Sequence, residues 1–311
     1  MSLDEKIGEV ALNLAKNENI QNKTVELLGM LFPYAGLTKK AVDMYISEIE
    51  MSDMSTEAKV FSVMNAKKTI KKIKNQKQIA DIAMENAKEG TDFTETSGVN
   101  EEWLERFMDS AGFVSSEDIQ LIWGKVLANE FEKPGTTPPN MIRILSEMTP
   151  TYAKAFRVIC SMQVLFLFLD NEDVVNSEWQ IIVPFEENID YMRKYGLSFE
   201  ILNELETLGV IKFEAVAGYI STDIQEERLL VHSNEKTLLA VAHNKGCVPI
   251  GNVLLTTAGE ALRQITPVDR MEGYTEALEK YMKANSVKFA ENVPFKVFVN
   301  GEDYQVLTTD L

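Results

Sequence analysis

The sequence is poor in the residues from which catalytic and metal sites are usually built. It contains two cysteines and two histidines in 311 residues. A closed zinc site takes four ligands and a catalytic one three, so carboxylates would have to complete any site that used His232, His243 and Cys247. Two thiols also provide no disulfide framework, which indicates a reducing cytoplasm. We therefore predict no metal, no cofactor and no nucleophilic catalyst.

Nucleotide-binding motifs and long apolar runs are missing as well. No G-x-x-x-x-G-K-S/T loop occurs, and no G-x-G-x-x-G follows a strand-like segment. The longest apolar run, residues 159–169, contains Ser161 and Gln163 and is shorter than the roughly 18 residues that a spanning helix needs. The N-terminus lacks the basic region and apolar core of a signal peptide. These absences favour a cytoplasmic protein that is not an enzyme.

Basic residues are also few compared with acidic ones. The chain has 31 Lys and Arg against 48 Asp and Glu, a net charge of −17, which disfavours a general nucleic-acid binder. The exception is a long helix expected from about residue 56 to residue 87, without Gly or Pro. Its middle can bind nucleic acid, anionic lipid or another polyanion, or can be a solvated face that meets acidic protein surface, which we favour. The lysines of this helix are Lys67, Lys68, Lys71, Lys72, Lys74 and Lys77.

The strongest pattern in the chain covers residues 100–156, which read as four successive helices. The first has an N-cap at Asn100 and ends at Gly112. Capping-box spacing at Ser115 predicts the start of the second, and Pro134-Gly135 stops it. The third begins at two prolines, residues 138–139. The fourth follows Thr149 and continues through the apolar run 164–169.

Aromatic residues in this region fall in register with the apolar stripes. Trp103 and Trp123 can form a ligand-stacking site, but their spacing is more typical of packing, so we assign them to the core. The predicted core and motif positions are Trp103, Phe107, Ile119, Trp123, Leu127, Pro134 and Gly135.

These residues carry a resemblance. The patterns W-L-x-x-F, S-x-E-D-I-Q-x-I-W-G-K-V-L-A-N-E, K-P-G-T and E-M-T-P-x-x-A-K-A-F resemble an uncharacterised bacterial family catalogued as a domain of unknown function. That family is similar to the abortive-infection alpha (Abi-alpha) proteins, which occur among phage-defence genes. The match is best over about residues 75–165 and continues weakly to about residue 285. It implies a soluble bacterial defence component. The family has no assigned catalytic residues.

A second resemblance lies in the C-terminal half. The patterns L-x-x-L-G-V-I at residues 205–211 and L-L-T-T-A-G-E-A-L at residues 254–262 are similar to winged-helix domains, with a β-hairpin between them. Such domains often bind DNA through their second helix. Here that helix, residues 198–208, carries Glu200, Glu204 and Glu206 and no Lys or Arg. Because phosphates would repel these carboxylates, we expect a structural or protein-binding module.

The whole pattern predicts an α+β fold that is mainly α. We expect four regions: residues 1–90, helical and bearing the lysines; residues 97–170, the four-helix centre; residues 171–270, the winged-helix-like unit; and residues 271–311, a helix and a β-hairpin turning at Asn300-Gly301. An apolar segment from Val25 to Leu37 can rest on a membrane surface or pack against a helix or a second copy. The leading hypothesis is a protein-interaction or self-associating component of a defence or stress system. The alternative is a polyanion binder using the lysines.

Overall fold

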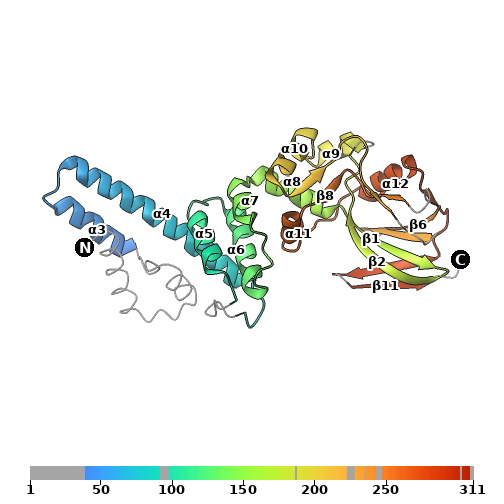
Figure 1. Ribbon diagram of the computed structural model, residues 1–311, viewed down its shortest axis with the longest axis horizontal. Helices are drawn as coiled ribbons and strands as arrows, with labels where there is room; N and C mark the ends of the chain where they lie inside the picture. The colour runs from blue at the N-terminus through green and yellow to red at the C-terminus, as the bar shows by residue number, and fades with distance from the viewer. Residues whose placement is uncertain are drawn as a thin grey trace. The chain divides into compact units, whose positions relative to one another are not determined.

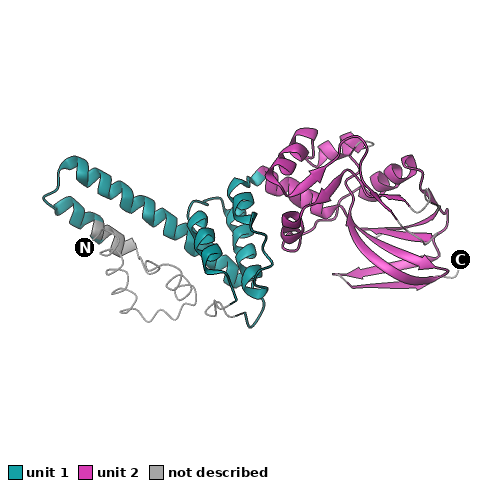
Figure 2. Ribbon diagram, viewed as in Figure 1, with its two compact units in different colours: residues 1–150 teal, residues 151–311 magenta. Residues whose placement is uncertain are grey.

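The computed structural model describes residues 39–91, 98–185, 188–222, 228–234, 236–242, 247–301 and 303–308. Helices dominate the N-terminal half and small sheets the C-terminal half (Figure 1), which confirms the predicted α+β class. The chain divides into two compact units, residues 1–150 and residues 151–311 (Figure 2). Within the described ranges, no helix has the length and apolar character to cross a membrane. The segment from Val25 to Leu37 lies outside the described residues.

Unit 1 contains five described helices. α3 (Lys39–Met51) and α4 (Thr56–Asn86) form an antiparallel pair, and α5 (Glu101–Ala111), α6 (Glu117–Glu132) and α7 (Met141–Glu147) pack at the C-terminal end of α4 (Figure 1). Ser55 caps α4, because its Oγ accepts a hydrogen bond from the Ala58 N–H at 3.3 Å. The long helix expected from about residue 56 to residue 87 is confirmed.

The core of unit 1 forms where α4 and α6 meet. Gly124 makes this approach close, since a Cβ atom there would lie 2.3 Å from Ile82 Cγ2. Next to it, Trp123 has no exposed surface, and its ring lies 4.7 Å from that of Phe107 of α5. Because Gly124 has no side chain, α4 and α6 can approach closely, and Trp123 packs tightly in the core beside this contact.

Two of the predicted helix starts need correction. α6 has its N-cap at Ser116, not Ser115. Ser115 does not cap the helix; its Oγ accepts a hydrogen bond from Asn75 Nδ2 of α4 at 3.2 Å. α7 begins at Met141, after the two prolines, which form a turn closed by the Met141 N–H to the Pro138 carbonyl at 2.9 Å. The N-cap at Asn100 is confirmed, with its Oδ1 accepting from the Trp103 N–H at 2.8 Å.

Unit 2 starts within α8 (Pro150–Ser161), and here a prediction was wrong. The apolar run 164–169 does not extend this helix; it is the strand β1 (Gln163–Asp170). The polar stretch after it belongs to β2 (Asp173–Ile181), which pairs with β1. β1 is a central strand with residues 164–169 all buried. A strand buried on both faces shows no alternation, so its sequence cannot be distinguished from a buried helix.

β1 belongs to a five-stranded sheet with the order β2-β1-β5-β6-β9. β5 (Arg228–Ser233), β6 (Lys236–Ala242) and β9 (Lys288–Phe289) complete it, and all neighbours pair antiparallel. The predicted C-terminal hairpin is confirmed as β10 (Phe295–Asn300) and β11 (Asp303–Thr308). Phe295 and Val297 pack on one face of the sheet, against Leu165, Leu167 and Leu230.

Unit 2 also contains helices and short strands outside this sheet. α9 (Ile189–Lys194) and α10 (Phe199–Leu208) precede β3 (Ile211–Phe213), which pairs with β8 (Val253–Leu255) ahead of α11 (Thr257–Arg263). Between these two strands the chain forms β5 and β6 and the short pair β4 (Ile220–Ser221) and β7 (Val248–Pro249). The hairpin expected as a wing, β5–β6, therefore belongs to the five-stranded sheet. α12 (Tyr274–Ala284) lies on the side of that sheet opposite β10–β11 (Figure 1).

Candidate functional site

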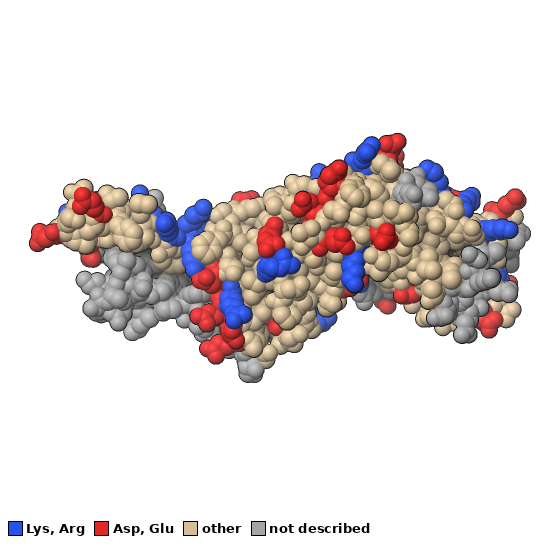
Figure 3. All heavy atoms as spheres, turned by 45° about the horizontal axis from the view of Figure 1, so that its top comes forward, with Lys and Arg blue, Asp and Glu red and all other residues tan. Residues whose placement is uncertain are grey.

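The lysines of α4 separate into two groups. Lys67, Lys68, Lys71 and Lys74 are exposed, and they form no ion pair with any residue that the structure describes. With 3.6 residues per turn, their spacing places all four along one side of the helix. Lys and Arg side chains gather along α4 in Figure 3, whereas elsewhere on this face they alternate with Asp and Glu.

The other two lysines are engaged in structural contacts. Lys72 pairs with Asp109, lies across Gly112 and holds its Nζ 5.1 Å from the centre of the Phe113 ring. Lys77 pairs with Asp81 one turn further along α4, at 2.6 Å. Of the six candidate lysines, Lys72 connects α4 to α5, Lys77 is paired within α4, and the other four face outward.

Large apolar side chains continue the exposed side of α4 towards its N-terminus. Val60, Phe61 and Met64 are 55%, 66% and 52% exposed. Positions 60, 64, 67, 71 and 74 are spaced by three and four residues, so they form one stripe that is apolar at its start and basic further on. We call this surface the apolar–lysine face; it consists of Val60, Phe61, Met64, Lys67, Lys68, Lys71 and Lys74.

Two buried amides fix the position of α4 beneath this face. Asn75 Nδ2 donates to the Gly112 carbonyl at 2.9 Å, and Gln76 Nε2 donates to the Met108 carbonyl at 2.8 Å. Both acceptors lie at the C-terminal end of α5, Met108 in its last turn and Gly112 at its C-cap, where few backbone N–H donors remain for the carbonyls. The Met108 carbonyl also accepts from the Gly112 N–H at 3.2 Å. These two residues were not among the predicted site residues, although two amides at the end of a lysine run were the available signal.

The predicted core and motif residues hold unit 1 together. Phe107, Ile119, Trp123 and Leu127 are buried, and Trp103 is half-buried with its ring 4.9 Å from that of Phe107. Because Trp123 has no exposed surface, no ligand can stack on it.

The turn after α6 explains the Pro134-Gly135 motif. Gly135 has a positive φ of 80°, a conformation that favours glycine. The buried carboxylate of Glu130 accepts hydrogen bonds from the Gly135 N–H at 2.7 Å and the Thr137 N–H at 3.0 Å. The Pro134-Gly135 turn therefore directs backbone N–H groups to the buried Glu130 carboxylate at the end of α6, which is a structural role.

The candidate catalytic groups lie apart or outside the described chain. Cys160 is buried, and burial raises the pKa of its thiol to about 12, which keeps it protonated. His232 is buried in unit 2 with its Nδ1 2.9 Å from Thr237 Oγ1, and burial lowers its pKa. His243 lies outside the described residues. Within the described part of the chain, no three His, Cys, Asp or Glu side chains are grouped to hold a metal ion.

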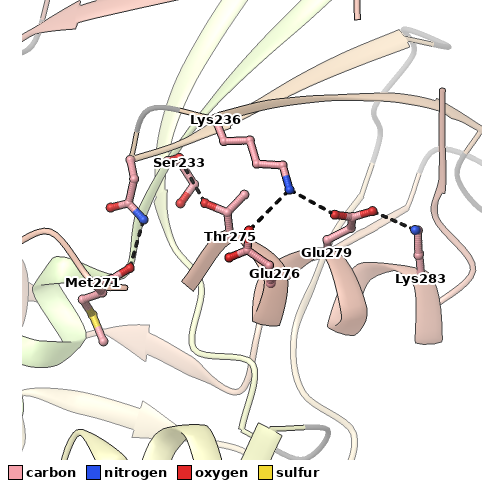
Figure 4. A network of polar contacts seen from close by, with 8 residues as sticks. Ser233, Lys236, Met271, Thr275, Glu276, Glu279 and Lys283 are labelled. Carbon is pink, nitrogen blue, oxygen red and sulfur yellow. Dashed lines mark hydrogen bonds and ion pairs between the residues drawn. The ribbon is translucent and has the colours of Figure 1, made fainter. Parts of the chain in front are cut away.

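A small pocket of about 170 Å³ lies beside His232, with Trp179 and Gln163 in its wall. The turn between β5 and β6, which carries part of that wall, is fastened to the region of α12 (Figure 4). Thr275 Oγ1 donates to the Ser233 carbonyl at 3.2 Å. The other fastening contacts are Asn234 Nδ2 to the Met271 carbonyl at 3.2 Å, and Lys236 Nζ to Glu276 at 3.5 Å and Glu279 at 3.6 Å.

The arrangement defines an α+β protein with a helical unit that presents the apolar–lysine face and a sheet-based unit that holds a small pocket. The chain belongs to the family described as "Protein of unknown function (DUF2806)", whose sequence model matches residues 64–279. This confirms the expected membership of a domain-of-unknown-function family. No curated protein and no solved structure matches the chain.

Proposed function

We propose that this protein acts by binding another protein through the apolar–lysine face of α4. The observation that supports this is the exposure of Val60, Phe61 and Met64 on the same side of the helix as the four outward lysines. Apolar side chains gathered at the surface mark interaction sites. Charges beside them select a partner of opposite sign and speed its approach. The partner would therefore carry an apolar patch bordered by Asp and Glu.

The order of residues along α4 favours a protein partner over a membrane. A helix that lies in a bilayer surface has its apolar side chains on one side and its lysines on the opposite side. On α4 the apolar residues and the lysines share one side and follow each other along the axis. Inserting Phe61 would bring Lys67 and Lys71 to the same depth, where a charged group is costly.

Nucleic acid fits this face less well. A phosphate backbone needs a positive field, and the net charge of −17 opposes its approach, although the four lysines would attract it locally. The half of the face formed by Val60, Phe61 and Met64 would gain nothing from phosphates. A protein with an apolar patch bordered by Asp and Glu would contact both the apolar half and the lysine half of this face.

The biological setting that we propose is bacterial defence. The resemblance to the Abi-alpha proteins supports a cytoplasmic component of an anti-phage or stress system that works by interaction, not by catalysis. In unit 2, the elements α10, β3, β8 and α11 come in a winged-helix-like order. We propose that this module also binds protein. Glu206 of α10 accepts a hydrogen bond from the Phe213 N–H at 3.0 Å, so it supports the module and repels phosphate.

Site-specific cross-linking tests the proposal. A photo-reactive amino acid in place of Phe61, in the full chain and its own bacterial host, should give an adduct with a protein. The triple change Lys67→Glu, Lys71→Glu and Lys74→Glu should abolish that adduct. The matched control reverses three exposed lysines elsewhere, Lys154, Lys212 and Lys296, and should leave it intact.

The same experiment can contradict the proposal in three ways. These are an adduct that survives the α4 triple change, an adduct with nucleic acid or lipid, and one formed only within a single chain. An adduct between two copies would identify the partner as the protein itself.

A further inference from the structure

The pocket of unit 2 lies at one end of the five-stranded sheet. Leu165 of β1 pairs with Trp179 of β2 and with His232 of β5, and directly opposed residues of an antiparallel sheet point to the same face. Trp179 and His232 therefore flank Leu165 on the face that Phe295 covers further along the strands. The pocket, about 170 Å³ in volume, opens where this cover ends, beside Val299 of β10.

Uncharged hydrogen-bonding groups line the interior. The side chains of Gln163 and Trp179 form no hydrogen bond with the residues that the structure describes. The Gln163 carboxamide can donate and accept, and the indole of Trp179 can donate. His232 is held through its Nδ1 by Thr237 at 2.9 Å, and burial lowers its pKa, which keeps the ring neutral at neutral pH.

Charge is confined to the rim. Asp269 and Arg270 contribute to the wall but are exposed and of opposite sign. Asp269 is also paired with Arg157 at 2.7 Å. A ligand that enters therefore meets no net charge, and an ion would lose its hydration without finding a buried counter-charge. The pocket favours a neutral ligand.

The volume sets the size of that ligand. A protein cavity of about 150 Å³ holds one benzene molecule, so the 170 Å³ of this pocket corresponds to a single six-membered ring. Trp179 offers a ring surface for an offset-stacked or edge-on contact. Gln163 offers a donor and an acceptor to the edge of such a ring.

We propose that this pocket binds a neutral single-ring heterocycle whose edge carries both a hydrogen-bond donor and an acceptor, as a pyrimidine base does. The ring lies against Trp179, and its amide-like edge meets the carboxamide of Gln163. His232 supplies a further polar contact from the neighbouring strand. This ligand site is separate from the apolar–lysine face and does not depend on the protein-binding role.

Titration of the full-length protein with uracil and with cytosine, followed by calorimetry, tests the site. Saturable binding is expected for at least one base. Gln163→Leu keeps the size of the side chain but removes its donor and acceptor, so it should weaken binding about tenfold. Gln180→Leu is the matched control, because Gln180 is adjacent to Trp179 in β2 and points to the opposite face. It should bind like the wild type.

Benzene serves as the apolar probe of equal size and should bind more weakly than the base. Trp179→Leu, checked for folding by its melting curve, should also lower the affinity. The proposal is overturned if neither base binds saturably, if Gln163→Leu binds the base as tightly as the Gln180→Leu control, or if benzene binds as well as the base.

Discussion

Trp123 is the largest fully buried side chain among the described residues. Its side chain has no exposed surface and contacts the ring of Phe107. Trp123→Ala should lower the free energy of unfolding by about 3 to 5 kcal/mol, because it removes apolar contacts and leaves a cavity. Urea denaturation measures this, with Phe113→Ala as the control, since Phe113 is 75% exposed. An unchanged urea midpoint in Trp123→Ala would contradict the placement of Trp123 in the core.

His232 should make stability depend on pH. Burial lowers its pKa in the folded chain, while the unfolded chain keeps the ordinary value of about 6.5. Below that pH the unfolded state binds more protons, so this contribution to stability is present above about pH 6.5 and is lost as the pH falls. His232→Gln should therefore show a smaller loss of stability between pH 7.5 and pH 5.5 than the wild type, measured by urea midpoints. Parallel losses in the two proteins would rule this out.

At the scale of elements, the hairpin β10–β11 acts as a cover for the sheet. Phe295 is buried against Leu165 and Leu167, whereas Phe298 of the same strand is 54% exposed. Phe295→Ala should lower the melting temperature by several degrees, since a buried aromatic truncation costs about 3 to 5 kcal/mol. Phe298→Ala is the matched control and should have a much smaller effect. Equal effects would mean that the hairpin does not cover the sheet through its Phe295 side.

The elements that could be predicted from the sequence are those fixed by local chemistry. Asn100 caps α5 and Ser198 caps α10 through bonds that span three residues, and such signals are visible in the sequence itself. β1 could not be predicted, because its identity as a strand is decided by pairing with β5, whose residues lie far along the chain. The predicted helix start at Ser115 was wrong for a similar reason, since the Ser115 hydroxyl accepts a hydrogen bond from Asn75 of another helix.

The candidate sites, too, could be predicted only where the signal is local in the sequence. The lysine cluster was evident from composition, but only the fold distinguishes Lys72, paired with Asp109, from the outward Lys67 and Lys71. Trp179 lies 16 positions after Gln163, and His232 a further 53. The three meet because β1, β2 and β5 are neighbours in one sheet. No spacing in the sequence could indicate that pocket.

At the scale of the whole molecule, charge decides which large partners can approach. The net charge of −17 and the carboxylates of α10 oppose duplex DNA, and the four outward lysines do not offset them. The full-length protein should not shift duplex DNA in a gel at about 150 mM salt, where the Debye length is about 8 Å. A sequence-selective shift that is lost on changing residues 198–208 would make the protein a DNA-binding regulator instead.

The position of β10 in the chain has a consequence for how unit 2 is made. A ribosome delivers β1 long before it delivers Phe295 and Val297, which cover one of its two apolar faces, and translation proceeds at about 5 to 20 residues per second. For several seconds the nascent chain therefore carries a bare leucine surface, with Leu165 and Leu167 accessible to chaperones or to other nascent chains. Translational pausing before residue 295 would lengthen that exposure and lower the yield of folded protein.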